Sequence, residues 1–128
     1  MPGGIDPHVH CAWHIPALEE GSEPTYTAPP SVVSRAALYG GTTTMIDFAS
    51  GEAGDTIQQM VENRDKEWVD RCYCDFAYHI MLRGDVPPPI VEEIGEAVQD
   101  GYATVKVFTT DITPSRKGRI CLLYTSPS

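Results

Sequence analysis

The spacing of apolar residues along the chain changes several times between two patterns. In one pattern, short runs of β-branched and other apolar residues stand between turn-forming residues. In the other, apolar residues recur every three to four positions. The first pattern is typical of strands buried in a parallel sheet, and the second of helices with one buried face. The chain is therefore expected to alternate between strands and helices.

Apolar runs predict strands in a stretch from Gly3 toward His10 and then over residues 42–49, 72–82 and 102–108. Apolar residues at helical spacing predict three helices between them. The residues with that spacing are Val32, Val33, Ala36 and Ala37 in the first helix, Ile57, Met60, Val61, Arg64 and Trp68 in the second, and Ile90, Ile94, Ala97 and Val98 in the third. The polar stretch 11–27 predicts a loop.

Proline and glycine mark the expected helix ends. Pro29-Pro30 suits the first turn of the first helix, which is expected to end at Gly40-Gly41. Asp55 is expected to cap the second helix. The third helix is expected to begin within the prolines of residues 87–89 and to end at Gly101.

This order of elements is typical of a parallel sheet with helical crossovers. An open doubly wound sheet and part of a (β/α)8 barrel both have it. No glycine-rich phosphate loop follows the first strand, which disfavours a dinucleotide-binding open sheet. We therefore expect an α/β fold over residues 1–120, a partial (β/α)8 TIM barrel. It would have about four parallel strands and three crossover helices, which is half a barrel.

Charge and composition exclude some partners. The 128 residues carry a formal net charge of -9 at pH 7, with a pI near 4.7. This charge argues against binding to nucleic acid or to an anionic membrane surface. No apolar run approaches the length of a membrane span. The four cysteines, Cys11, Cys72, Cys74 and Cys121, include no CxxC pair, so we expect reduced thiols and a cytoplasmic protein.

The first candidate site residues are His8 and His10. Residues i and i+2 of an extended strand point to the same face, so the two imidazoles would project side by side, spaced to bind one metal ion. The alternative is that they are two polar residues where a strand ends. A histidine pair with this spacing is by itself a weak signal.

The second candidate is Lys106, which stands in the middle of an expected strand. Val105 and Val107 would face the helices, so Lys106 would face the barrel interior. An unpaired buried ammonium group is costly. Carbamylation by CO₂ would convert it into an anionic ligand that can bridge two metals. Alternatively, Lys106 pairs with a carboxylate such as Asp47, or extends to solvent.

Together these segments resemble one enzyme family. His8-Val9-His10 after Gly3-Gly4-Ile5-Asp6-Pro7, then residues 40–49, then Val105-Lys106-Val107-Phe108, resemble the dihydropyrimidinase/hydantoinase branch of the cyclic amidohydrolases. Tyr78-His79-Ile80-Met81 is similar to the third strand of that family. The resemblance extends from Pro2 to about Arg119.

The resemblance implies a (β/α)8 barrel with a binuclear metal centre, usually Zn²⁺, and a parent protein that forms a homotetramer. His8 and His10 would bind the first metal, and carbamylated Lys106 would bridge both metals. The remaining ligands and the aspartate that acts as general acid/base would come from later strands that this chain does not reach. The implied reaction is metal-assisted hydrolysis of a C–N bond in a small cyclic amide.

One position departs from the family. The tyrosine expected five residues after the bridging lysine is replaced by Asp111, so the hydantoin or dihydropyrimidine substrate is in doubt. Asp111 and His79 are candidates to line the substrate site. The alternatives for the whole protein are a non-catalytic hydantoinase-like assembly protein, such as the collapsin-response mediator proteins, and a hydrolase of the dihydroorotase or allantoinase type.

The ends of the chain carry two further expectations. Met1 leads directly into an expected strand, so it is interpreted as internal to a longer protein. Residues 121–128 resemble a translated sequencing adapter and are expected to be a non-native tail. The chain is therefore expected to be a fragment that is inactive by itself.

Overall fold

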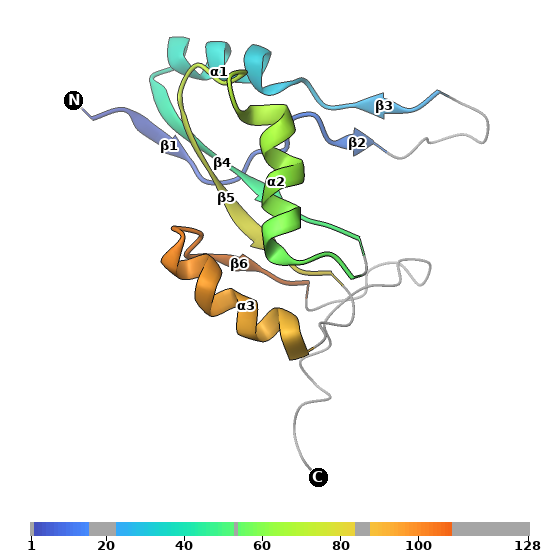
Figure 1. The fold of residues 1–128 in the computed structure, drawn as a ribbon. Helices are drawn as coiled ribbons and strands as arrows, with labels where there is room; N and C mark the ends of the chain where they lie inside the picture. The colour runs from blue at the N-terminus through green and yellow to red at the C-terminus, as the bar shows by residue number, and fades with distance from the viewer. Residues whose placement is uncertain (1, 16–22, 53, 84–87, 109–128) are drawn as a thin grey trace.

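A computed structural model describes residues 2–15, 23–52, 54–83 and 88–108. Figure 1 shows the order of their helices and strands. The strands are β1 (Gly4–Asp6), β2 (His14–Ile15), β3 (Thr25–Tyr26), β4 (Thr42–Ala49), β5 (Asp75–Met81) and β6 (Val105–Lys106). The helices are α1 (Pro30–Tyr39), α2 (Ile57–Trp68) and α3 (Pro88–Gln99).

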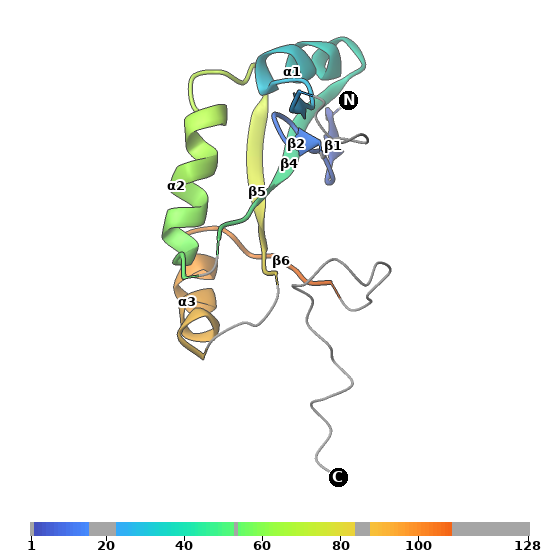
Figure 2. The same ribbon diagram turned by 90° about the vertical axis from the view of Figure 1, so that its right-hand side faces the viewer.

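The main sheet has four strands in the order β1-β4-β5-β6, and every neighbouring pair is parallel. The longest pairing joins β4 to β5, from Thr44 opposite Asp75 to Ala49 opposite Ile80. Figure 2 shows α2 along one side of this curled sheet, with α1 above it and α3 below it. The expected half barrel of four parallel strands and three helices is confirmed.

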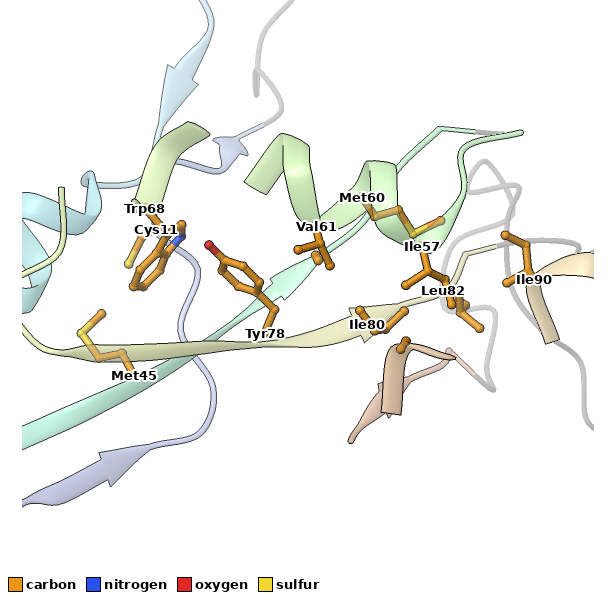
Figure 3. Close-up of a cluster of buried hydrophobic side chains, with 12 residues drawn as sticks. Cys11, Met45, Ile57, Met60, Val61, Trp68, Tyr78, Ile80, Leu82 and Ile90 are labelled. Atoms are coloured by element: carbon orange, nitrogen blue, oxygen red, sulfur yellow. The ribbon is translucent and has the colours of Figure 1, made fainter. Parts of the chain in front are cut away.

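The hydrophobic core lies between the sheet and the helices. Met45 and Ala49 of β4 and Tyr78 and Ile80 of β5 alternate with residues of the opposite face, and all four are buried. Trp68 of α2 is fully buried against them, as Figure 3 shows. The main core cluster therefore lies on the helix face of the sheet, while Phe48 and Met81 are buried on the opposite face.

The helix ends agree with the sequence except at one cap. Gly41 and Gly101 follow α1 and α3 with φ of 86° and 103°, a left-handed conformation that favours glycine. The N-cap of α2 is Thr56 and not Asp55. Its hydroxyl accepts from the Gln59 amide while the Gln59 side chain accepts from the Thr56 amide, a capping box. Asp55 instead accepts from the amide of Glu52 at 2.9 Å.

The polar stretch 11–27 was expected to be a loop, and this expectation was wrong in part. β2 and β3 pair antiparallel within it, with His14 opposite Tyr26. These strands have only two residues each, which is too short for an alternation of apolar and polar residues to predict them. The pairing is joined by backbone hydrogen bonds on its flanks, from Thr27 N to Trp13 O and from Ala12 N to Ala28 O. Residues 12–15 and 25–28 therefore form a small two-stranded antiparallel sheet of their own.

Several expected elements are shorter or less buried than the sequence suggested. β1 ends at Asp6, β5 begins only at Asp75 and β6 contains two residues. Val32, Ala36 and Val98 are exposed, although they belong to the predicted apolar faces. Only one narrow stripe of each helix meets the sheet, since successive helical residues are rotated by about 100°. In the described part of the chain, no helix combines the length and apolar character needed to cross a bilayer.

Candidate metal centre

The face of the sheet that points away from the helices carries the candidate site. The register places Phe48 of β4 beside His79 of β5, and Met81 of β5 beside Lys106 of β6. Side chains alternate between faces along each strand, so these four residues share the face opposite Ile80. Lys106 therefore lies on the interior face of the half barrel, opposite the helices.

His8 and His10 reach the same face from the segment that follows β1. Although β1 ends before them, the amide of Val9 still donates to the carbonyl of Ile46 in β4 at 3.0 Å. Val9 packs against the core on the helix side. Its two neighbours point the other way, with ring centroids 5.2 Å apart and ring planes at 78°.

Phe48 is the centre of this cluster. The rings of His8 and His10 lie 4.7 and 4.8 Å from its ring, centroid to centroid, and His10 is stacked on it. The Nζ of Lys106 lies 5.7 Å from the same ring centroid, within the range of a cation–π contact. His79 lies 5.1 Å away, and Phe48 itself is only 2% exposed. One buried aromatic ring thus gathers side chains from β4, β5, β6 and the end of β1.

His79 is held by the protein on both of its ring nitrogens. Its Nδ1 lies 2.5 Å from the hydroxyl oxygen of Thr104, and its Nε2 lies 2.8 Å from the carbonyl oxygen of Pro7. A carbonyl only accepts, so Nε2 donates to Pro7, and in the neutral ring Nδ1 accepts from the Thr104 hydroxyl. His79 therefore ties β5 to the segment before His8 and to the start of β6.

Asp47 is on the other side of the sheet from Lys106, and the alternative that these two residues pair was wrong. The Asp47 carboxylate is fully buried and lies 2.5 Å from the guanidinium of Arg64 on α2. It also accepts from the backbone amide of Cys11 at 2.9 Å and from the indole N–H of Trp13 at 2.8 Å. Arg64 donates in addition to the carbonyl of Cys11.

The Asp47 network was not recognised from the sequence. It anchors the backbone directly after His10 from the helix side, so it helps to fix where that imidazole lies. A charged residue inside the apolar run 42–49, with an arginine on the buried stripe of the next helix, is the signal that could have identified it. Asp47 and Arg64 position the segment that carries His10, and Trp13 also contacts the His10 ring edge to face, with the ring centroids 5.2 Å apart.

The electrostatics of the two sides differ. Partial burial lowers the pKa of His10 below its ordinary value, and the neighbouring His8 adds to the effect while Asp47 opposes it. The neutral imidazole that this favours is the form that binds a metal ion. Cys11, the next residue, is buried on the helix side, and burial raises the pKa of its thiol to about 12.

The donor set can contribute to a metal site. Two imidazoles share one face, and a lysine amine lies near the same aromatic ring. Among the described residues, no three His, Cys, Asp or Glu side chains are placed to hold one ion together. His8, His10 and Lys106 would thus form part of a ligand set that other groups must complete. Asp111 lies outside the described residues.

No family model matches the chain. Curated proteins do match it. The chain is 30% identical over 109 residues to a D-hydantoinase of Streptomyces coelicolor, covering 84% of this chain and 22% of that protein. It is 31% identical over 110 residues to the dihydropyrimidinase of Rattus norvegicus, covering 84% of this chain and 20% of that protein. The chain thus spans about a fifth of the length of these relatives.

Solved structures give the same result. A crystal structure of a D-hydantoinase superposes with a TM-score of 0.74 at 27% identity, covering 91% of this chain and 24% of that one. A dihydropyrimidinase from Brevibacillus agri superposes with a TM-score of 0.72 at 26% identity, with the same coverage. The fold, the order of the strands and the sequence agree, and the chain belongs to the dihydropyrimidinase/hydantoinase family.

Proposed function

We propose that this chain supplies part of the metal centre of a zinc-dependent hydrolase that opens the C–N bond of a small cyclic amide. The observation that carries the proposal is the cluster around Phe48, where His8, His10 and Lys106 gather at the carboxyl ends of parallel strands. Barrel enzymes place their chemistry at this end of the sheet. The family relationship supports the same reaction class.

In this proposal His8, His10 and Lys106, the last as a carbamate, would be the ligands that this chain supplies to zinc. Bound zinc supplies a water nucleophile at neutral pH and polarises the scissile carbonyl. The lowered pKa of His10 keeps its imidazole neutral and able to act as a ligand. Phe48 excludes water from one side of the cluster, and His79 holds the segment that carries His8 through the Pro7 carbonyl.

Zinc binding by the chain tests the ligand roles directly. We expect His8→Ala and His10→Ala each to weaken zinc binding by about tenfold or more. The matched control is His14→Ala, because His14 is an exposed histidine of β2 that packs against Tyr26 and not against Phe48. Equal zinc affinity in all three variants would reject the assignment of His8 and His10.

Catalysis is tested in a chimera, because the chain spans about a fifth of its relatives and is expected to show no turnover alone. The matched segment of the Streptomyces coelicolor D-hydantoinase is replaced by this chain's residues. Hydantoin, dihydrouracil, dihydroorotate and allantoin are then assayed with zinc and bicarbonate. A folded, zinc-loaded chimera without turnover on any of them would contradict the proposal.

Lys106 has its own test in that chimera. Lys106→Ala is expected to abolish turnover, and a short carboxylate such as propionate is expected to restore part of it by taking the place of the carbamate. Lys66→Ala is the control, since Lys66 lies on the exposed surface of α2. Loss of activity without rescue would leave Lys106 as a packing residue and would count against the carbamate.

The two histidines count against the non-catalytic alternative. An assembly protein of this fold does not need the two imidazoles, whereas here both are present and share one face.

We further propose, from the family alone, that the whole protein acts in the cytoplasm as a homotetramer on a small molecule, without nucleic acid or membrane. Light scattering on the active chimera measures the number of subunits.

A further inference from the structure

The turn between α2 and β5 contains two cysteines whose sulfur atoms are in contact. The Sγ atoms of Cys72 and Cys74 lie 3.7 Å apart, and the thiol of Cys72 also donates to the carbonyl of Cys74 at 3.2 Å. The sequence predicted both residues within the extended strand 72–82. Instead, the chain bends at Tyr73 and Cys74 before β5 begins, which accounts for the short distance.

Two hydrogen bonds hold the turn, one from the residue between the two cysteines and one from the residue before them. The amide of Tyr73 donates to the hydroxyl of Ser34, a fully buried residue of α1, at 3.0 Å. Before Cys72, the amide of Arg71 donates to the carbonyl of Trp68, the last residue of α2. The two sulfur atoms are therefore kept close by the packing of α1 and α2.

We propose that Cys72 and Cys74 are a redox-active dithiol that a peroxide converts into an intramolecular disulfide. A disulfide has an S–S length of about 2.05 Å, so the two sulfur atoms need to approach by less than about 2 Å. Both side chains are half-buried, so a small peroxide can reach them. The site lies on the helix side of the sheet, away from the Phe48 cluster, and does not depend on the proposed hydrolase activity.

The two sulfur atoms differ in their environment. Burial and the hydrogen bond with Cys72 raise the pKa of Cys74 to about 11, so Cys74 keeps its proton at neutral pH. Because the thiolate is the reactive form, the raised pKa disfavours Cys74 as the first sulfur to react. Cys11 is also on this side of the sheet, but it is 1% exposed and its pKa is raised to about 12.

The reaction is balanced in two steps. The Cys72 sulfur attacks one oxygen of hydrogen peroxide, the O–O bond breaks, and Cys72 becomes a sulfenic acid with release of one water. The Cys74 sulfur then attacks the Cys72 sulfur, the S–O bond breaks, and a second water leaves as the disulfide forms. Peroxide is reduced by two electrons, and the two thiols are oxidised by the same number.

The experiment uses the full chain with Cys121→Ser, because Cys121 lies outside the described residues and its thiol would otherwise be counted. After hydrogen peroxide treatment, we expect a mass loss of about 2 Da, reversed by dithiothreitol. Peptide mapping is expected to join Cys72 to Cys74 and to leave the Cys11 thiol free. Sulfinic acids at the two positions without a cross-link would overturn the proposal.

Matched variants separate the pair from the third thiol. Cys11→Ser should still lose about 2 Da, whereas Cys72→Ser and Cys74→Ser should form no intramolecular disulfide. Circular dichroism checks that each variant is folded. Because neighbouring cysteines can also close a ring in an unfolded chain, the rate is measured with and without urea. Faster closure in the folded chain is expected, and equal rates would show that the fold does not prepare the site.

Discussion

The two faces of the same four-stranded sheet are built in different ways. On the helix side, Met45, Ala49 and Ile80 are 0–1% exposed. Asp47, the one fully buried carboxylate there among the described residues, accepts hydrogen bonds from the segment that follows His10 and from Arg64 of α2. On the opposite side, Ile5 is 64% exposed, and the polar groups gather around the single buried ring of Phe48.

This difference separates stability from function. The helix side pairs the Asp47 carboxylate within the described residues and contributes most of the buried apolar surface, although Arg64 Nε and Trp68 Nε1 are buried there without a hydrogen-bond partner. The other side holds imidazoles and an amine whose chemistry needs further partners. A substitution on the helix side should therefore change the free energy of unfolding, whereas one on the opposite side should change ligand binding.

The largest expected effect is that of Asp47→Ala. It leaves the partly buried Arg64 guanidinium and the donors of Cys11 and Trp13 without their acceptor. We expect the free energy of unfolding to fall by about 3–5 kcal/mol, measured by urea denaturation. The double variant Asp47→Ala/Arg64→Met should recover part of the loss, because no charge remains unpaired. A loss below about 1 kcal/mol in the single variant would contradict this account.

A matched pair of isoleucines compares the faces directly. Ile80 is fully buried on the helix side, and Ile46 is half-buried on the opposite side. Ile80→Ala should lower the free energy of unfolding by about 2–5 kcal/mol through lost burial and an unfilled cavity. Ile46→Ala should cost less than half as much. Equal losses would show that the two faces are packed alike.

A smaller effect is expected at the start of α2. Thr56→Ala removes the hydroxyl that accepts from the Gln59 amide, and the expected loss is about 1 kcal/mol. Thr25→Ala, at an exposed position of β3, is the control and should change the free energy of unfolding by less than about 0.5 kcal/mol. This comparison asks whether the helical layer depends on its own caps as well as on the sheet.

The smallest expected effect is the dependence of the free energy of unfolding on pH that Cys11 contributes. Burial raises the pKa of Cys11 to about 12, above the ordinary value of 9.0. The unfolded chain therefore releases this proton first. The stabilisation that Cys11 contributes is complete below pH 9 and is lost as the pH rises toward 12. Thermal melts from pH 8 to 10.5 should fall less steeply for Cys11→Ala than for the unchanged chain.

The same environment predicts the chemical behaviour of Cys11. Its thiol should resist iodoacetamide at pH 8 in the folded chain and react once urea unfolds it, because the thiolate is the reactive form. Rapid labelling of Cys11 in the folded chain would show that this side of the sheet is open to solvent. His10, one residue earlier, lies on the opposite face and has a lowered pKa.

Local patterns in the chain were enough to predict the alternation of strands and helices and the ends at Gly41 and Gly101, because periodicity and left-handed turns are properties of neighbouring residues. The placement of Lys106 on the face away from the helices followed from the same alternation. The family motifs identified the half barrel for a related reason, since each motif lies within one short segment.

Contacts between distant segments could not be predicted in this way. From the sequence, Lys106 was a possible partner of Asp47. The packing of α2 on one face of β4 instead places Arg64 beside the Asp47 carboxylate. The tertiary structure likewise decides three further features: the pairing of β2 with β3, the convergence of four segments on Phe48, and the bend that brings Cys72 close to Cys74. Alternation assigns a residue to a face, but the partner it meets there depends on how separate elements are packed together.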